Sequence, residues 1–415
     1  MSETRTPAGA LNGLRVLDLS RVLAGPWCTQ ILADLGADVI KVERPGSGDD
    51  TRHWGPPFLR DGDGADTAHA TYFAAANRNK RSVTIDFTRP DGQALIRSMA
   101  ARADVLVENF KVAGLAAYGL DYDSLQALNP RLIYCSITGF GQTGPYAERA
   151  GYDLLIQASS GMMSITGRPD SEPGGGGMRV GVAITDLFTG IYASTAILAA
   201  VQARHATGRG QHIDMALLDV GMAVLANQAS AYLNTGRPPQ RQGNSHPSIV
   251  PYQDFPTADG AMLLAVGNDG QFAKFCAAAG RSEWAADPRF ARNTSRVEHR
   301  DTLVPMIAEV TRTRTTADWI EALGPLGVPC GPINDIAQAF ADPQVTARGL
   351  VLDQPTAEGR DIRRIRGVRS PLRLSEHPPV VRSAPPALGE HTDEVLAELG
   401  VDAAERERLR AAGTI

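Results

Sequence analysis

A single carboxylate, Asp186, stands in the segment RVGVAITDLFTG (residues 179–190), where an apolar stretch passes into an apolar helical pattern. Two interpretations are open. Thr185 and Asp186 are both residue types that begin helices, and a negative charge in the first turn interacts favourably with the helix dipole. A carboxylate that follows an apolar strand at the edge of a cleft can instead act as a covalent nucleophile. The spacing alone favours the capping role.

Positive charge gathers at two places in the first hundred residues. Arg44 follows the apolar run DVIKVE, at the edge where open α/β sheets bind their ligands. Lys80 and Arg81 directly precede another apolar run. At each place the basic residues could bind an anion or could simply be solvated at the surface. The pattern does not decide between these two interpretations.

The turn SRVLAGPWC offers only Gly25 where a dinucleotide-binding turn needs several glycines for the close approach of a pyrophosphate. A nicotinamide dehydrogenase is therefore disfavoured, although the predicted helix N-terminus at residues 24–27 is still able to hold an anion. The histidines form no i, i+4 pair, and Cys28, Cys135, Cys276 and Cys330 form no C-x-x-C pair. A hydrolase triad, a zinc site and a disulfide framework are not indicated.

The elements that position these residues follow an alternating pattern. Over the first 220 residues, short apolar runs alternate with helix-period segments, which predicts α/β architecture with a parallel sheet. Six strands are predicted, in LRVLDLS, DVIKVER, RSVTIDF, DVLVENF, RLIYCSITGFG and MRVGVAI. Helices are predicted over AGPWCTQILADLGA, over about Arg89 to Ala103 and after Asp186, and GGGG at 174–177 predicts a loop.

A chain of 415 residues exceeds a single compact core. After about Leu225 the composition shifts to Pro, Gly and Asn, followed by a strand pattern in AMLLAVGN and helical patterns in DGQFAKFCAAAG and RDTLVPMIAEVTRT. We predict a discontinuous large domain, residues 1–225 and 340–415, and a small domain with linkers, residues 226–339. The Pro-rich segment 370–392 predicts an extended path before a final helix near residues 393–399.

The net charge of −5 and the lack of like-charge runs indicate no nucleic-acid partner. No stretch of about 18 apolar residues is free of charge, and the first residues lack the basic-then-apolar order of a secretory signal. The sequence therefore predicts a cytoplasmic protein that does not bind a membrane.

Several blocks of sequence, in one order, resemble the family III CoA-transferases, a family that also contains the α-methylacyl-CoA racemases. The blocks cover nearly the whole chain: LRVLDLSRVLAGPWCTQILADLGADVIKVERPGSGDDTR, NKRSVTIDF, ADVLVENF, ITGFGQTGP, GYD, ITDLFTGIYASTAILAA, TGRGQHIDMALLD, GVPCGPIND and LGEHTDEVLAELG. GNSHPSIVPYQDFPTADG followed by AVGNDGQF is most similar to the branch that moves CoA from succinyl-CoA to small dicarboxylates such as glutarate, itaconate or mesaconate.

The resemblance implies a Rossmann-like large domain, a smaller α+β domain and a homodimer of two interlocked ring-like chains. It implies an acyl-CoA and a carboxylic acid as substrates, with the coenzyme A thioester as co-substrate, no tightly bound cofactor and no metal. The family's nucleophile falls on Asp186, which would form an aspartyl anhydride and then an aspartyl-CoA thioester. The family's CoA contacts fall on Leu23, Ala24, Arg44, Ile85, Asp86, Asn109, Phe110, Lys111 and Tyr152.

The chain also departs from the family. Some members carry basic residues where this chain has Ala117 and Ala150, so phosphate recognition must differ or come from Lys111 or Lys80. The glycine-rich loop of oxalate-specific members is missing near residues 244–248, which argues against oxalate. We expect residues 242–252 and 267–270 to sense the acceptor acid, with Arg241 or His246 pairing with its distal carboxylate.

Two alternatives remain. An α-methylacyl-CoA racemase needs two bases on opposite faces of the α-carbon, and the family's racemases place a histidine where GYD has Tyr152, a poor base at neutral pH. A non-catalytic CoA-binding protein would use the same cleft without needing Asp186.

Overall fold

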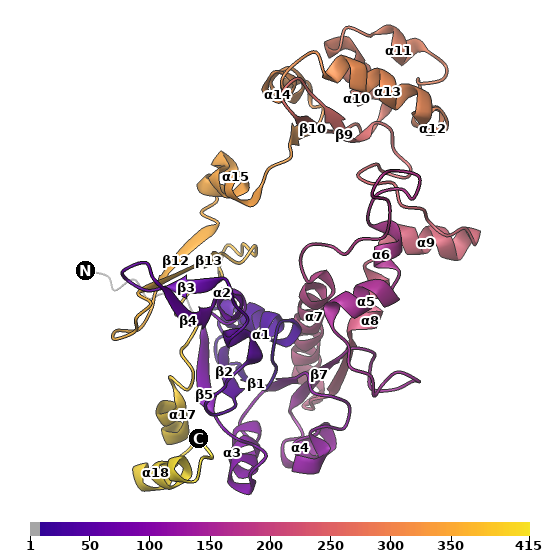
Figure 1. Ribbon diagram of the computed structural model, residues 1–415. Helices are drawn as coiled ribbons and strands as arrows, with labels where there is room; N and C mark the ends of the chain where they lie inside the picture. The colour runs from indigo at the N-terminus through magenta and orange to yellow at the C-terminus, as the bar shows by residue number, and fades with distance from the viewer. Residues whose placement is uncertain (1–8) are drawn as a thin grey trace. The chain divides into compact units, whose positions relative to one another are not determined.

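The computed structural model describes residues 9–415, which form two compact units (Figure 1). Unit 1 comprises residues 9–162, Arg179–Arg237 and Ala347–Ile415. Unit 2 comprises Met163–Met178 and Pro238–Thr346. The predicted domain borders at residues 225 and 340 stay a prediction.

Unit 1 is built on a parallel sheet. Its six strands are β1 (Arg15–Asp18), β2 (Asp38–Glu43), β5 (Lys80–Thr84), β6 (Val105–Glu108), β7 (Ile133–Thr138) and β8 (His212–Ala216). They lie in the order β5-β2-β1-β6-β7-β8, and every neighbouring pair is parallel. The predicted α/β class with a parallel sheet is confirmed. The strand order reverses between β1 and β6, the kind of position at which open α/β sheets bind ligands.

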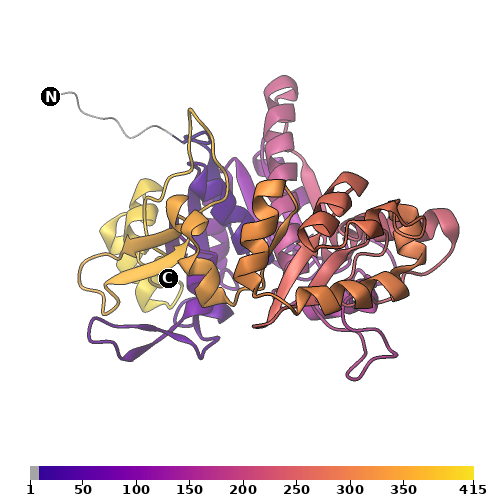
Figure 2. The same ribbon diagram turned by 90° about the horizontal axis from the view of Figure 1, so that it is seen from above.

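Helices cover both faces of this sheet, because the strands are apolar on both sides. One face carries α3 (Pro90–Ala100), α4 (Tyr122–Leu128), α17 (Thr392–Glu398) and α18 (Ala403–Ala411). The other carries α1 (Ala24–Asp34), α5 (Asp153–Ser159), α7 (Ile184–Thr207) and α8 (Leu217–Ala223). The C-terminal helices, yellow in Figure 2, therefore lie beside strands from the start of the chain.

Helix α7 is long and apolar enough to cross a membrane, judged by length and composition only. Its residues Ala193, Ile197 and Ala200 are buried in the same core cluster as Cys28 and Leu32 of α1. Packing against α1 and the sheet accounts for the apolar residues on one face of α7, whereas Ile191 and Tyr192 on the helix are exposed.

The predicted strand over residues 178–184 is wrong. This segment has no regular secondary structure before α7 begins at Ile184, and the sixth strand is β8 instead. The Val180 N–H donates to the Gln157 side chain (2.8 Å), so a side chain of α5 takes a bond that a neighbouring strand would otherwise supply. Asp186 therefore lies in the first turn of a helix and does not follow a strand.

Unit 2 has an antiparallel sheet, β11 (Cys330–Pro332), β10 (Ala261–Ala265) and β9 (Tyr252–Pro256), in that order. Its helices are α10 (Asp269–Ala278), α11 (Glu283–Ala286), α12 (Asn293–Glu298), α13 (Arg300–Thr311), α14 (Thr316–Leu323) and α15 (Ile336–Ala341). Phe255, Phe272 and Trp319 are fully buried in one core. The predicted strand in AMLLAVGN and the two predicted helices of this region are confirmed as β10, α10 and α13.

The remaining elements are short. Two hairpins are formed by β3 (Phe58–Arg60) with β4 (Asp66–Ala70) and by β12 (Val351–Pro355) with β13 (Arg364–Val368). The short helices are α2 (Thr71–Ala75), α6 (Met162–Ile165), α9 (Ala226–Thr235) and α16 (Pro343–Ala347). Residues 376–391 run mostly without regular structure, and Arg382 donates to three carbonyls at the end of α1, which confirms the predicted extended path.

Candidate functional site

A cavity of about 690 Å³ opens at the carboxyl edge of the sheet in unit 1. Its walls come from the segments that follow β1, β2, β5, β6 and β7, together with the first turn of α7. The cavity therefore includes the position where the strand order reverses, between β1 and β6.

The structure brings every predicted catalytic and coenzyme A-binding residue to this one cavity. The lining includes Asp186 and all nine predicted coenzyme A contacts: Leu23, Ala24, Arg44, Ile85, Asp86, Asn109, Phe110, Lys111 and Tyr152. These residues span 164 positions of sequence, from 23 to 186, and they meet because parallel strands end at the same edge.

Asp186 is the third residue of α7, yet it does not cap that helix. The N-cap residue is Ala183, and no side-chain hydrogen bond caps the helix. Burial, together with the nearby Asp153 carboxylate, raises the pKa of Asp186 to about 7. Within residues 9–415, Asp186 forms no ion pair that would offset its burial. Such a carboxylate is a candidate nucleophile or base.

Asp153 is a site residue that the sequence did not point to. Its Oδ1 accepts from the Thr185 N–H (2.9 Å) and from Thr185 Oγ1 (2.6 Å), and its Oδ2 accepts from Gln157 Nε2 (2.7 Å). Asp153 thus joins the start of α5 to the start of α7, one residue before Asp186. The sequence feature that could have indicated it is its place as the last residue of the GYD block.

Tyr72, in the first turn of α2, was also missed. Burial raises the pKa of its phenol, and the Asp186 and Asp153 carboxylates raise it further. The Tyr72 ring packs edge-on against Trp54, with ring centroids 5.4 Å apart. Nothing in the local sequence distinguishes Tyr72, because its proximity to Asp186 arises from tertiary packing.

Two glycines allow close packing around the start of α1. A Cβ at Gly25, the second residue of α1, would lie 2.3 Å from the Ser20 Cβ, so the approach of Ser20 requires glycine there. A Cβ at Gly190 would lie 2.7 Å from the Ala24 carbonyl oxygen. The start of α7, which carries Asp186, therefore packs directly against the first turn of α1, which carries Ala24.

Four exposed basic residues line the cavity: Arg21, Arg44, Lys111 and Arg149. Arg149 was missed, although it precedes Ala150, where some family members have a basic residue. Its guanidinium lies over the Tyr146 ring, 3.9 Å from the centroid. Arg149 therefore supplies a cation close to the position where Ala150 has none.

Of the alternatives for phosphate recognition, Lys80 is excluded by the structure, whereas Lys111 lines the cavity. Lys80 is 1% exposed, and its ammonium group donates to Asp18 (3.1 Å), the Pro26 carbonyl (2.9 Å) and Asn77 (2.9 Å). Burial lowers the pKa of Lys80 to about 8, against the opposing effect of Asp18. Strand pairing places Lys80 beneath the start of α1, where three partners use its donors.

Aromatic side chains form one wall of the cavity. Phe110 packs edge-on against Phe87 (centroids 5.5 Å apart), and Phe87 packs against Tyr118 (5.6 Å). The Arg21 guanidinium lies 5.3 Å from the Phe110 centroid. This wall combines apolar rings with a cation, which suits a planar aromatic ligand group.

The predicted acceptor residues lie in unit 2. Arg241 pairs with Asp170 and donates to the Ser164 carbonyl (3.0 Å), and the His246 ring lies 5.3 Å from that of Tyr252. In the part of the chain that the structure describes, no group of three or more His, Cys, Asp or Glu side chains is placed to hold a metal ion.

Comparisons with known proteins extend over both units. The sequence profile of CoA-transferase family III matches residues 11–392. A succinate–glutarate CoA-transferase of Agrobacterium fabrum is 55% identical over 389 residues, which cover 94% of this chain and 95% of that protein. A human succinyl-CoA:glutarate CoA-transferase is 42% identical over 391 residues, 94% of this chain and 86% of that protein.

Solved structures agree with the fold. A CAIB/BAIF family protein from Brucella suis is 51% identical, and its crystal structure superimposes with a TM-score of 0.82 over 94% of this chain and 100% of that one. The similarity therefore extends over most of each unit.

Proposed function

The chain belongs to CoA-transferase family III, and from that premise we propose that it moves coenzyme A from succinyl-CoA to a small dicarboxylic acid of the glutarate type. The names of several relatives support this choice of substrates, since they pair succinate or succinyl-CoA with glutarate, mesaconate or citramalate. The observation that carries the proposal is Asp186, a carboxylate with a raised pKa and no ion pair among the described residues, at the wall of the unit 1 cavity.

In the proposed mechanism, an Asp186 oxygen attacks the succinyl-CoA carbonyl carbon, the C–S bond breaks, and CoA leaves as a thiolate. The product is a mixed aspartyl–succinyl anhydride. The thiolate then attacks the aspartyl carbonyl, which releases succinate and leaves an aspartyl-CoA thioester on the enzyme. The acceptor carboxylate repeats the two steps in reverse order, so a new thioester departs and Asp186 is restored.

The surroundings of Asp186 favour these reaction steps in two ways. An ionised carboxylate without ion pairs is poorly stabilised, so it is a better nucleophile than a solvated one. A bound thioester that fills the cavity would also exclude water, which would otherwise hydrolyse the anhydride and lose the thioester energy.

We assign the coenzyme A portion to the nine predicted contacts, with Arg21 and Arg149 added. Arg44, Lys111 and Arg149 would neutralise its phosphates, since they are exposed cations on the cavity wall. Phe110 and Phe87 would pack against the adenine ring. Leu23 and Ala24, at the start of α1, would border the thioester near Asp186.

Neither alternative is favoured. A racemase needs a second base, and Tyr152 replaces the histidine that the family's racemases carry at that position. A transferase should not exchange label into C2 of a 2-methylacyl-CoA in deuterated water, whereas a racemase must. A binding protein without catalysis would have no use for a partly buried carboxylate with no ion pair at the cavity wall.

The proposal includes a cytoplasmic homodimer of interlocked chains. The path of the chain supports it: the chain leaves unit 1 after Arg237 and returns to it at Ala347, so residues 238–346 form a circuit that begins and ends on unit 1. We assign acceptor recognition to residues 242–252 and 267–270, with Arg241 or His246 as the partner of the distal carboxylate.

The test is a panel of dicarboxylates with succinyl-CoA, in which the new thioester and free succinate are separated and quantified. We expect glutarate-type acids to be converted, Asp186→Asn to lower turnover by about 10³-fold or more, and Asp219→Asn to retain it. Asp219 is a matched control because it is the third residue of α8 and is exposed. Turnover by Asp186→Asn near that of Asp219→Asn would contradict the proposal.

A further inference from the structure

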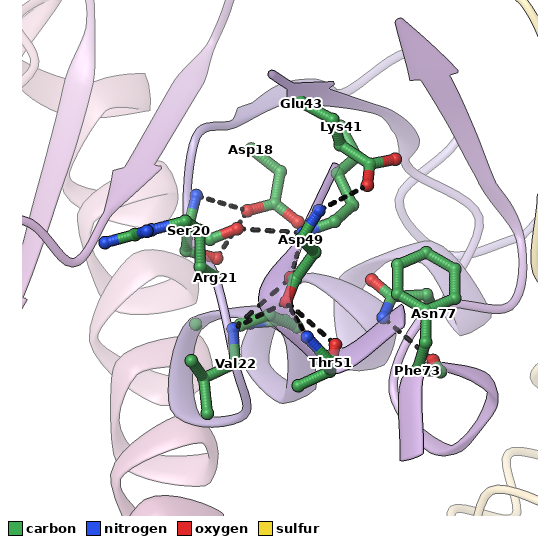
Figure 3. Close-up of polar contacts among 12 residues, drawn as sticks. Asp18, Ser20, Arg21, Val22, Lys41, Glu43, Asp49, Thr51, Phe73 and Asn77 are labelled. Carbon is green, nitrogen blue, oxygen red and sulfur yellow. Dashed lines mark hydrogen bonds and ion pairs between the residues drawn. The ribbon is translucent and has the colours of Figure 1, made fainter. Parts of the chain in front are cut away.

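Side chains form hydrogen bonds with five successive backbone groups in the turn between β1 and α1, from the Ser20 N–H to the Val22 N–H. Asp18 accepts from the Ser20 N–H (3.0 Å), and Lys41 donates to the Ser20 carbonyl (2.8 Å). Asn109 bonds both the N–H (2.8 Å) and the carbonyl (2.7 Å) of Arg21. Asp49 accepts from the Val22 N–H, 3.3 Å from each carboxylate oxygen (Figure 3).

This density of contacts coincides with an unusual backbone conformation. Val22 has φ of +69°, in the left-handed region that β-branched residues rarely adopt. Such a conformation persists only where the surroundings determine it, and it is found most often at functional sites. Asp49 contacts the N–H of this residue, and Asn109 contacts both backbone groups of the preceding Arg21.

The Asp49 carboxylate is itself fixed by hydrogen bonds and an ion pair. Its carboxylate pairs with Lys41 (3.0 Å), both side chains are fully buried, and it accepts from the N–H and hydroxyl of Thr51. Burial alone would raise the pKa of Asp49, but Lys41 and Thr51 lower it to about 2, so it is ionised at neutral pH. The Lys41, Thr51 and Val22 groups around this carboxylate all act as donors toward it.

The turn matters to the site because it leads directly into the cavity wall. Arg21, Val22, Leu23 and Ala24 all line the cavity that contains Asp186. The Ala24 carbonyl also touches the position of Gly190 on α7. A shift of the Val22 peptide would therefore move the cavity wall that faces the acyl-CoA.

We propose that Asp49 is a positioning residue of the transfer site: it fixes the Val22 peptide in the left-handed conformation and so sets Leu23 and Ala24 against the acyl-CoA. This inference rests on the proposed function. Asp49 acts through the turn, together with Asn109, whose amide oxygen and nitrogen both bond Arg21.

The test compares substitutions at Asp49 and Val22 in the full-length protein. In Asp49→Asn one carboxylate oxygen becomes an NH₂ group that must face a donor, and the negative charge that attracts Lys41 is lost, so the hold on the Val22 peptide weakens. We expect KM for succinyl-CoA to rise about ten-fold or more, with KM for the acceptor acid unchanged. A general loss of structure would affect both substrates alike.

Rescue provides the decisive comparison. Glycine adopts positive φ without steric conflict, whereas alanine does not. We therefore expect Val22→Gly, but not Val22→Ala, to restore most of the succinyl-CoA affinity in the Asp49→Asn background. If Asp49→Asn alone fails to fold, the two double variants are compared directly. Equal KM values for succinyl-CoA in the two double variants would overturn the inference.

Amide hydrogen exchange separates this inference from the proposed function. We expect Asp49→Asn to speed exchange at the Val22 amide about ten-fold or more and to leave the amides of α1 unchanged. If the wild-type protein transfers no CoA, the proposed function fails, and the exchange result still decides whether Asp49 holds the turn. Unchanged Val22 exchange, or an unchanged KM for succinyl-CoA in an active Asp49→Asn variant, overturns the inference.

Discussion

Asp186 differs from an aspartate that caps a helix, and the same chain provides the comparison. Asp318, in the first turn of α14, forms a capping box with Thr315, and those hydrogen bonds lower the pKa of Asp318. Asp186 has no such bonds, and burial raises its pKa to about 7. The pKa values of two aspartates at equivalent helix positions are thus shifted in opposite directions, because Asp318 is hydrogen-bonded and exposed to solvent whereas Asp186 is partly buried at the wall of a cavity.

The raised pKa predicts a pH dependence. The attacking species is the ionised carboxylate, whose population grows as pH rises through the pKa, so kcat/KM should increase with pH along an acid limb near pH 7. Asp153→Asn removes the second cause of the shift and leaves burial, so the limb should move to lower pH without reaching that of a solvated aspartate. A pH–rate profile of both proteins checks this, and a limb that stays in place would rule out the influence of Asp153.

Arg149 is assigned to a phosphate of coenzyme A. Arg149→Ala should raise KM for succinyl-CoA about ten-fold, weaken its dependence on salt and leave KM for the acceptor acid unchanged. Arg209→Ala is the control, since Arg209 is an exposed arginine outside the cavity lining. Steady-state kinetics at two ionic strengths make the measurement, and equal KM values in the two variants would remove Arg149 from the site.

The sequence predicted which residues line the cavity, but it did not predict the contacts of each side chain. The resemblance located Asp186 and the nine cavity-lining contacts. The resemblance could not reveal that the Lys80 ammonium group donates to Asp18 and Asn77, because those contacts depend on strand pairing. The conformation of Val22 and the contact between Asp153 and Thr185 are likewise tertiary, so no local pattern indicates them.

At the scale of elements, the site depends on the close packing of α1 and α7. Gly190→Ala would bring a Cβ within 2.7 Å of the Ala24 carbonyl oxygen, and a backbone atom there can move only with its helix. Overpacking of about 1–3 kcal/mol should outweigh the roughly 1 kcal/mol that alanine gains in a helix. We expect a lower melting temperature and a lower kcat.

Gly181→Ala provides the control for that substitution, because nothing lies within 4 Å of its Cβ position. It should keep the wild-type melting temperature in the same thermal denaturation experiment. An unchanged melting temperature and kcat for Gly190→Ala would show that the two helix starts are free to separate.

Periodicity located most elements because the strands of unit 1 are continuous apolar runs and the helices are long. It failed at residues 178–184, where an apolar run lacks a strand partner and bonds to Gln157 instead. The true sixth strand, β8, reads HIDMA, whose exposed His212 and Asp214 weaken the apolar signal. Apolar content alone does not show whether residues 178–184 or residues 212–216 form the edge strand of the sheet.

At the scale of the molecule, we predict an interlocked homodimer. Light scattering should give twice the mass of one chain. Because interlocked rings cannot separate without opening, tagged and untagged dimers mixed under native conditions should form no mixed dimers, and denaturation with subsequent refolding should produce them. Rapid formation of mixed dimers without denaturation would exclude interlocking, and the mass of a single chain would exclude the dimer.

In the proposed mechanism, CoA transfer passes through a covalent bond to Asp186. Hydroxylamine added during turnover of succinyl-CoA, followed by peptide mass spectrometry, tests for this bond. An aspartyl-CoA thioester should be captured as a hydroxamate at Asp186, and the peptide of Asp186→Asn should carry none. An unmodified Asp186 in an enzyme that is turning over, or a hydroxamate on another carboxylate, would contradict this claim.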